Sequence, residues 1–224
     1  MEEPKRIQYS SDNPVLNNPY LEPKFHYDTD VDGNVDYSTI INGRRPYGYD
    51  ISIVPQKAKL VKALFTQEDF SSNNPNSDFI NGIRKEVKTW RTAGYPKASR
   101  ITKELLDFWF SNSQRLPQQR LFFCQQEAVE TAVWLNEIAD KDANMGNFYL
   151  RELQDRRHTV SNDDDDILPR TAFKMATGTG KTVVMAMLIL YHYLNKKANP
   201  IDTRYADHFL VCAPGITIRD RLGV

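Results

Sequence analysis

Residues 173–187 read FKMATGTGKTVVMAM, and this stretch decides the fold that we expect. It holds two glycines, a lysine and a threonine between two apolar runs. We predict that residues 171–176 form a short buried strand. We predict that Lys181 to Lys197, which is apolar nearly all round, forms a helix enclosed by the rest of a domain. A strand, a tight turn and a buried helix are the local structure that a phosphate-binding loop requires.

The residues of the turn suit a nucleoside triphosphate. Because they lack a Cβ, Gly178 and Gly180 let the backbone turn its N–H groups inward, and a phosphate can then lie at the positive end of the helix. We expect Lys181 to contact the β- and γ-phosphates and Thr182 to offer its hydroxyl to the bridging Mg²⁺. The alternative, a turn that merely starts a helix, requires neither the Gly-Lys-Thr order nor the preceding strand. The predicted nucleotide-binding residues are Thr177, Gly178, Thr179, Gly180, Lys181 and Thr182, with Lys181 and Thr182 also predicted as catalytic and Thr182 as the Mg²⁺ ligand.

A glutamine upstream of the turn bears on the choice of base. The stretch LFFCQQEAV, residues 121–129, contains Gln125, whose amide can donate and accept hydrogen bonds and so pair with an adenine edge. We predict that Gln125 selects ATP, and the alternative is that it is simply a residue in the first turn of a helix. An aromatic residue farther upstream, Phe108 or Trp109, could stack on the base, although helical spacing is also typical of core residues.

A second apolar stretch follows the loop. The segment HFLVCAPGITIRDR, residues 208–221, is predicted to be a buried strand that ends in a loop. We predict that Arg219 and Arg221 in that loop contact the phosphates of a nucleic acid. Surface arginines that cap a helix are an equally good interpretation.

These stretches resemble the beginning of a type III restriction enzyme Res-type subunit, a superfamily 2 helicase-like ATPase. The resemblance spans about residues 40–224 and rests on NGIRKEVKTWRTAGYP, LLDFWF, LFFCQQEAVETAVWL, MATGTGKT and FLVCAPGITIRDRL. Met175 stands where the general phosphate-loop pattern has glycine, and this variant is similar to motif I of superfamily 2. A nucleotide kinase or transporter ATPase would share the loop, but Met175 and the glutamine stretch count against that class. Gly215 departs from motif Ia, which usually has threonine after the proline.

The resemblance implies an α/β fold, namely an incomplete RecA-like P-loop NTPase domain preceded by a mixed α+β N-terminal region. It implies an ATP hydrolase that uses ATP and Mg²⁺ to move along double-stranded DNA as a helicase or translocase, with an endonuclease domain and a methyltransferase (Mod-type) partner subunit. Such an ATPase also needs a strand that ends in Asp-Glu and an arginine finger from a second lobe. No apolar run in this sequence ends in Asp-Glu. We therefore expect an N-terminal fragment that is inactive on its own.

Two regions are expected, an N-terminal accessory region over residues 1–118 and the first part of the ATPase domain over residues 119–224. The accessory region is predicted to contain a turn at residues 32–34, a hairpin of strands 37–41 and 49–54 around a turn at residues 42–43, a helix from Asp78 that ends before Gly94, and a second helix over residues 102–110. A third helix is predicted over residues 125–140. The residues of these helices that we expect to be buried are Phe79, Ile80, Ile83, Val87 and Trp90 in the first, Leu105, Leu106 and Trp109 in the second, and Ala128, Val129, Ala132, Val133, Leu135 and Ile138 in the third. The alternative function is a non-catalytic protein-interaction module, with residues 1–118 docking a partner, or an inactive gene fragment.

The composition bounds the remaining possibilities. Lys plus Arg number 29, and Asp plus Glu also number 29. This balance gives no support for binding of nucleic acid, and it does not exclude such binding. The apolar run from Val183 to Tyr191 is about half of the roughly 20 residues that a membrane span needs. Cys124 and Cys212 are expected to be buried free thiols, which fits a soluble protein of the cytoplasm. Residues 158–169, with four consecutive aspartates at residues 163–166, are predicted to form an exposed loop instead of a metal site.

Overall fold

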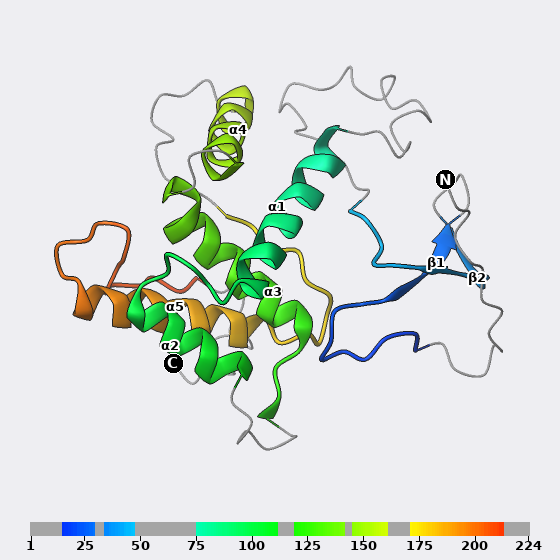
Figure 1. Cartoon of the computed structure of the whole chain (residues 1–224), viewed down its shortest axis with the longest axis horizontal. Coiled ribbons are helices and arrows are strands. Elements are labelled where there is room, and N and C mark those ends of the chain that lie inside the picture. Colours follow the sequence, from blue (N-terminus) through cyan, green and yellow to red (C-terminus); the bar gives the residue numbers. More distant parts are fainter. Residues whose placement is uncertain are drawn as a thin grey trace.

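The computed structural model describes residues 15–29, 34–47, 75–111, 119–141, 145–160 and 171–212. The helices are α1 (Pro75–Thr92), α2 (Arg100–Leu106), α3 (Phe123–Val133), α4 (Met145–Val160) and α5 (Lys181–Ala198), with short π- or 3-10-helical segments η3 (Asp107–Ser111), η5 (Trp134–Ile138) and η6 (Ala139–Lys141). The strands β1 (Phe25–Thr29) and β2 (Val35–Asn42) form an antiparallel two-stranded sheet. In Figure 1 the helices gather on one side, and this sheet extends away from them on the other.

The sheet pairs β2 with the strand that precedes it in the chain. The predicted strand 37–41 is confirmed as part of β2, whereas its expected partner, residues 49–54, lies outside the described residues. The strand that does pair with β2 is β1, which the sequence analysis did not predict. Gly43, with φ of +109°, donates its N–H to the carbonyl oxygen of Lys24 at 2.6 Å and so continues the pairing with β1. The turn at residues 42–43 therefore ends this hairpin instead of forming its tip.

α1 is the first predicted helix, and it begins at Pro75, slightly earlier than predicted, because proline is well tolerated in a first turn. Its end is as predicted, since Gly94 has φ of +74°. The Gly94 N–H donates to the carbonyl oxygen of Arg91, and the Tyr95 N–H donates to that of Trp90, each at 3.0 Å. These two bonds form a Schellman motif, which satisfies the last carbonyls of the helix. Of the predicted core face, Phe79, Ile83, Val87 and Trp90 are buried, whereas Ile80 is half-buried.

The second and third predicted helices are also present, and each continues into a π-helical segment. Ser99 caps α2, because its Oγ accepts a hydrogen bond from the Thr102 N–H at 3.0 Å. α2 with η3 covers the predicted range 102–110, and α3 with η5 and η6 covers 125–140. Of the residues predicted to be buried there, Leu105, Leu106, Trp109, Ala128, Val129, Val133 and Ile138 are buried, whereas Ala132 and Leu135 are half-buried.

One hydrophobic cluster joins α1, α2, α3 and α5. Its most deeply buried members include Val87, Leu106, Val129 and Tyr191. α4, which the sequence analysis did not predict, joins the cluster through Tyr149, whose ring centroid lies 5.5 Å from that of Phe79. Helices from both predicted regions thus share a core. The division between residues 118 and 119 stays a prediction.

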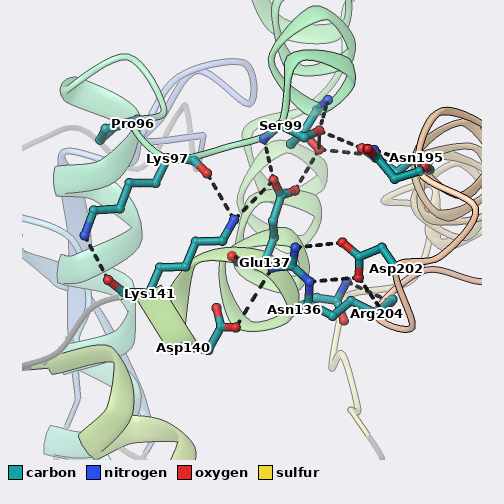
Figure 2. Close-up of polar contacts among 12 residues, drawn as sticks. Pro96, Lys97, Ser99, Asn136, Glu137, Asp140, Lys141, Asn195, Asp202 and Arg204 are labelled. Carbon is teal, nitrogen blue, oxygen red and sulfur yellow. Dashed lines mark hydrogen bonds and ion pairs between the residues drawn. The ribbon is translucent and has the colours of Figure 1, made fainter.

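A buried carboxylate, Glu137 of η5, adds polar contacts between α2 and α5 (Figure 2). Its side chain accepts hydrogen bonds from the Ser99 N–H and, at 2.8 Å, from the Thr102 hydroxyl. The Tyr191 hydroxyl donates to the same carboxylate at 3.3 Å. Asn195 of α5 accepts from the Ser99 hydroxyl at 2.6 Å and donates to Thr102 Oγ1 at 3.1 Å. Because each buried polar group has a partner, the cluster holds both helices against η5 without an orphaned donor.

The chain after α5 closes over the same cluster. Arg204 Nη2 donates to Asp202 Oδ2 at 2.8 Å, and Arg204 Nη1 donates to the Glu137 carbonyl oxygen at 3.4 Å (Figure 2). The hydrogen bonds from Arg204 lower the pKa of Asp202 to about 2. Burial, together with the Glu137 carboxylate, raises the pKa of Tyr205 to about 12. At neutral pH Asp202 is therefore charged, which strengthens its hydrogen bonds with Arg204, and Tyr205 is neutral.

Three predictions about the loop and its surroundings are wrong for the described residues. Residues 171–176 are extended but form no strand, and their side chains are exposed or half-buried. Residues 208–212 also form no strand and are exposed. α5 is confirmed over the predicted range, but it is not enclosed, since Val183 is 41% exposed and Leu190 is 40% exposed. A strand needs a neighbouring strand to which it is hydrogen-bonded. Within the described part of the chain, residues 171–176 and 208–212 have no such neighbour, so no sheet covers the exposed face of α5.

The cysteines and the acidic segment complete the comparison with the sequence. Cys124 and Cys212 are free thiols, as predicted, but neither is buried. Cys124 is half-buried, and Cys212 is exposed because no sheet covers residues 208–212. α4 extends to Val160, where a loop was expected, and the aspartates at residues 163–166 lie outside the described residues. Among the helices that the structure describes, none combines the length and the apolarity of a membrane span.

Candidate nucleotide-binding site

The glycine-rich loop connects residues 171–176 to α5. Its backbone adopts the left-handed conformation twice, at Gly178 with φ of +78° and at Gly180 with φ of +75°. The Gly180 carbonyl then starts the helix, because it accepts hydrogen bonds from the Val183 N–H at 2.9 Å and the Val184 N–H at 3.3 Å. The first N–H groups of a helix have no acceptor within the helix and give this end a partial positive charge. The loop therefore has the local backbone that a phosphate seat requires.

Lys181 lies at the surface of this loop. Its Nζ donates a hydrogen bond to the carbonyl oxygen of Ala176 at 2.7 Å, and Thr179 Oγ1 donates to the same oxygen at 2.7 Å. Lys181 and Thr182 are both exposed, so neither side chain is held inside the core. A phosphate oxygen would carry a charge where the Ala176 carbonyl offers only a dipole, and charge-assisted hydrogen bonds are stronger. The ammonium group is thus free to exchange one acceptor for the other.

Gln125 of α3 meets the loop directly. Its side chain is 4% exposed, and its Oε1 accepts a hydrogen bond from the Phe122 N–H at 2.8 Å, which caps α3. Its Nε2 lies against Gly180, where an added Cβ would overlap it. The structure therefore brings together two predicted site residues, Gln125 and Gly180, that are far apart in the sequence. Gln125 does serve the first turn of its helix, and its predicted role in selecting adenine stays a prediction.

The two glycines of the loop offer a matched pair of substitutions. Gly178→Ala adds a Cβ in open space and carries only the left-handed backbone strain, which costs about 1–2 kcal/mol. Gly180→Ala carries the same strain and must also displace the Gln125 amide. We expect Gly178→Ala to weaken MgATP binding by roughly tenfold and Gly180→Ala to weaken it further, in calorimetric titrations of both variants.

The unfolding midpoint of each glycine variant serves as the control for an intact fold. Equal affinities of the two variants for MgATP would show that contact with Gln125 does not matter to the loop.

A groove of about 350 Å³ runs along α5 from the loop. Lys181 stands at the loop end, and the walls are mainly apolar, with Phe173, Met175, Leu188 and Phe209 among the lining residues. His192 lines it farther along, and burial lowers the pKa of this imidazole. The His192 Nδ1 atom is buried and has no hydrogen-bond partner in the described structure. The apolar walls suit packing against protein better than they suit phosphate.

The first turn of α3 is held by two arginines that the sequence analysis did not single out. The ring of Phe123 contacts two guanidinium groups, since Cζ of Arg44 lies 5.6 Å from its centroid and Cζ of Arg91 lies 5.1 Å from it. Each arginine is also paired with a carboxylate of α3. Arg44 Nη2 donates to Glu127 Oε2 at 2.6 Å, and Arg91 Nε donates to Glu130 Oε2 at 2.7 Å. This clamp joins the segment after β2 and helix α1 to the start of α3.

The arginines of the clamp stay charged. Burial alone would lower the pKa of the Arg91 guanidinium, but the hydrogen bond and the charge of Glu130 raise it overall. Arg44 behaves in the same way, because Glu127 outweighs the effect of burial on its pKa. The sequence feature that could have pointed to this clamp is a pair of acidic residues, at positions 127 and 130, on an otherwise apolar helix face.

Other predicted site residues have different outcomes. Arg219 and Arg221 lie outside the described residues, so their contact with nucleic acid stays a prediction. Trp109 is 6% exposed and belongs to the hydrophobic core, which confirms the alternative interpretation for this residue, whereas Phe108 is 55% exposed. Within the described ranges, no group of three or more His, Cys, Asp and Glu side chains could hold a metal ion. A Mg²⁺ ion at the loop would have Thr182 as its predicted protein ligand.

Comparison with protein families gives a match for part of the chain. Residues 118–222 match the family model described as type III restriction enzyme, res subunit. The matched segment includes both Gln125 and the glycine-rich loop. The match suggests a helicase-like ATPase of restriction systems and implies a RecA-like P-loop fold for this segment. This segment, slightly less than half of the chain, is similar to the res subunits of type III restriction enzymes. Comparisons with curated proteins and with solved structures give no significant match.

Proposed function

We propose that the chain is the N-terminal, ATP-binding part of a DNA-dependent helicase-like ATPase or translocase of a restriction endonuclease. The observation that carries this proposal is the loop before α5, where two left-handed glycines precede an exposed lysine and the amide of Gln125 lies against Gly180. The family match over residues 118–222 supports the same class.

Each loop residue has a distinct part in the proposed site. The backbone of residues 177–180 surrounds the phosphates, and Lys181 exchanges the Ala176 carbonyl for a β- or γ-phosphate oxygen. Thr182 turns its exposed hydroxyl to the Mg²⁺ that bridges the phosphates. Gln125 holds Gly180 in place and presents the amide that favours adenine.

Binding is proposed without turnover by this chain alone. Hydrolysis needs an Asp-Glu pair that holds the metal and orients water, together with an arginine finger, and no apolar run of the sequence ends in Asp-Glu. In the complete enzyme, Arg219 and Arg221 are proposed to contact the backbone of double-stranded DNA. A Mod-type methyltransferase subunit is the proposed protein partner, and the cytoplasm is the proposed location.

The direct test is calorimetric titration of the chain with ATP in the presence of Mg²⁺. We expect one ATP to bind per chain, GTP to bind more weakly because of Gln125, and ADP to compete with ATP. Absence of MgATP binding by a chain that is folded, as judged by circular dichroism, would refute the proposed function.

A further inference from the structure

The chain after β2 returns to α1, where Asn81 holds its backbone (Figure 1). Asn81 Oδ1 accepts a hydrogen bond from the Tyr47 N–H at 2.9 Å, and Asn81 Nδ2 donates to the Tyr47 carbonyl oxygen at 3.3 Å. Three residues farther along the helix, Cζ of Arg84 lies 5.7 Å from the centroid of the Tyr47 ring. Residues 44–47 are therefore fixed beside the Arg84 guanidinium.

Basic side chains gather around this contact, and the nearby carboxylates already have partners. Three ion pairs use these carboxylates, namely Arg44–Glu127, Arg91–Glu130 and Lys88–Glu22. Arg45 and Arg84 differ, because neither forms an ion pair with a carboxylate in the part of the chain that the structure describes. Two guanidinium groups are thus left without a paired negative charge on this surface.

Arg84 is half-buried without such a partner. Burial and the charge of Arg44 lower the pKa of its guanidinium, and the charge of Glu127 offsets them only in part. A cation–π contact with Tyr47 is weaker than a charge-assisted hydrogen bond, so the ring replaces a carboxylate incompletely. A bound anion would supply the missing partner of this half-buried charge.

Arg45 lies close to the same point and is exposed. It precedes Tyr47 by two residues, so their Cα atoms are at most about 7 Å apart. The planar guanidinium matches two oxygens of one phosphate group. Because Arg45 stands on an open surface, the pair suits an extended chain of phosphates better than a small anion, which needs an enclosing pocket.

We propose that Arg45 and Arg84 contact phosphates in the backbone of double-stranded DNA, on a surface formed by α1 and residues 44–47. This surface lies outside the segment 118–222 that matches the family model, so the N-terminal region takes part in holding the DNA. Contacts to phosphate carry no sequence preference. The choice of DNA as the polyanion rests on the proposed function of the chain.

The test measures binding of a fluorescently labelled DNA duplex to the whole chain, by anisotropy at several salt concentrations. Arg45→Gln and Arg84→Gln each remove one charge. We expect each to weaken binding about three- to tenfold at about 0.1 M salt and to reduce the slope of log K against log salt by about 0.9, as for one lost phosphate contact. Arg45→Lys keeps the charge and should keep the slope. Arg151→Gln, at an exposed arginine of α4, is the matched control and should change neither quantity.

Two further measurements separate contact with DNA from other roles. Arg84→Gln should unfold at or above the wild-type temperature, because it removes a half-buried charge without a paired carboxylate. If its midpoint falls instead, the exposed Arg45 decides the result. Both glutamine variants should keep the wild-type affinity for MgATP. A loss would show that these arginines contact the phosphates of the nucleotide, which overturns the proposed DNA contact.

The remaining outcomes distinguish this inference from the proposed function. Unchanged DNA affinity and slope in both glutamine variants would overturn it, as would an equal loss in Arg151→Gln, which would indicate a general effect of net charge. Tighter binding of poly-glutamate than of the duplex would assign the surface to an acidic protein segment. A wild-type chain that binds MgATP but no duplex would overturn this inference alone. A chain that binds the duplex but not MgATP would refute the proposed nucleotide site and leave the DNA contact standing.

Discussion

Lys181→Ala should lower the affinity of the chain for MgATP by roughly 10- to 100-fold. The ammonium group supplies the one full positive charge in the loop sequence from Thr177 to Thr182, and a hydrogen bond to a charged group contributes about 1.5–3 kcal/mol, at about 1.4 kcal/mol per tenfold change. The fold should persist, because Lys181 is exposed and its hydrogen bond is to Ala176 within the loop. Calorimetric titration with MgATP measures the effect.

The matched control for this substitution is Lys85→Ala, which removes an exposed lysine of α1 and should leave MgATP affinity unchanged. Circular dichroism of both variants tests that the helices are retained. Wild-type affinity in Lys181→Ala would contradict the assignment of the loop. The same conclusion would follow if a full-length enzyme with this substitution hydrolysed ATP normally in the presence of DNA.

Glu130→Ala should reduce the free energy of unfolding by about 3–5 kcal/mol, the usual cost of removing one partner of a buried ion pair. The Glu130 side chain is fully buried, and its carboxylate accepts hydrogen bonds from Arg91, from the Tyr95 hydroxyl at 2.7 Å and from Gln126 Nε2 at 2.8 Å. Without it, the largely buried Arg91 guanidinium keeps its charge and loses its partner. Urea denaturation followed by circular dichroism measures the loss.

Two comparisons make the Glu130 result specific. Glu104→Ala removes the exposed partner of Arg100 and should cost at most about 1 kcal/mol. The double variant Arg91→Leu, Glu130→Leu removes both charges and should be less destabilised than Glu130→Ala, because no unpaired charge remains. A loss below about 1 kcal/mol in Glu130→Ala would mean that water or another group already satisfies Arg91.

Much of the helical structure could be predicted from the sequence. α1 follows from the apolar spacing of Phe79, Ile83, Val87 and Trp90, and its end follows from Gly94, which adopts the left-handed conformation without strain. The start of α5 at Lys181 follows from the glycines before it. These features depend on hydrogen bonds between residues close in the chain and on the backbone preferences of single residues.

The pairing of strands and the degree of burial of α5 could not be predicted in the same way. The segment 37–41 was correctly predicted as extended, but its pairing with β1 was not predicted. The bond from Gly43 to Lys24 that continues this pairing joins residues distant in the chain. Residues 171–176 have a strand-like pattern, yet they form no strand, because pairing requires a neighbour that the local sequence does not specify.

By itself, the sequence determined the class of local structure and the chemistry of the loop, since glycine, lysine and threonine act within a few residues of one another. Only the tertiary structure decided that Gln125 meets Gly180, that Phe123 contacts both Arg44 and Arg91, and that the carbonyl oxygen of Pro19 accepts a hydrogen bond from the first turn of α3. These contacts join residues tens of positions apart. Their geometry depends on how the helices pack around the shared core, which no local pattern encodes.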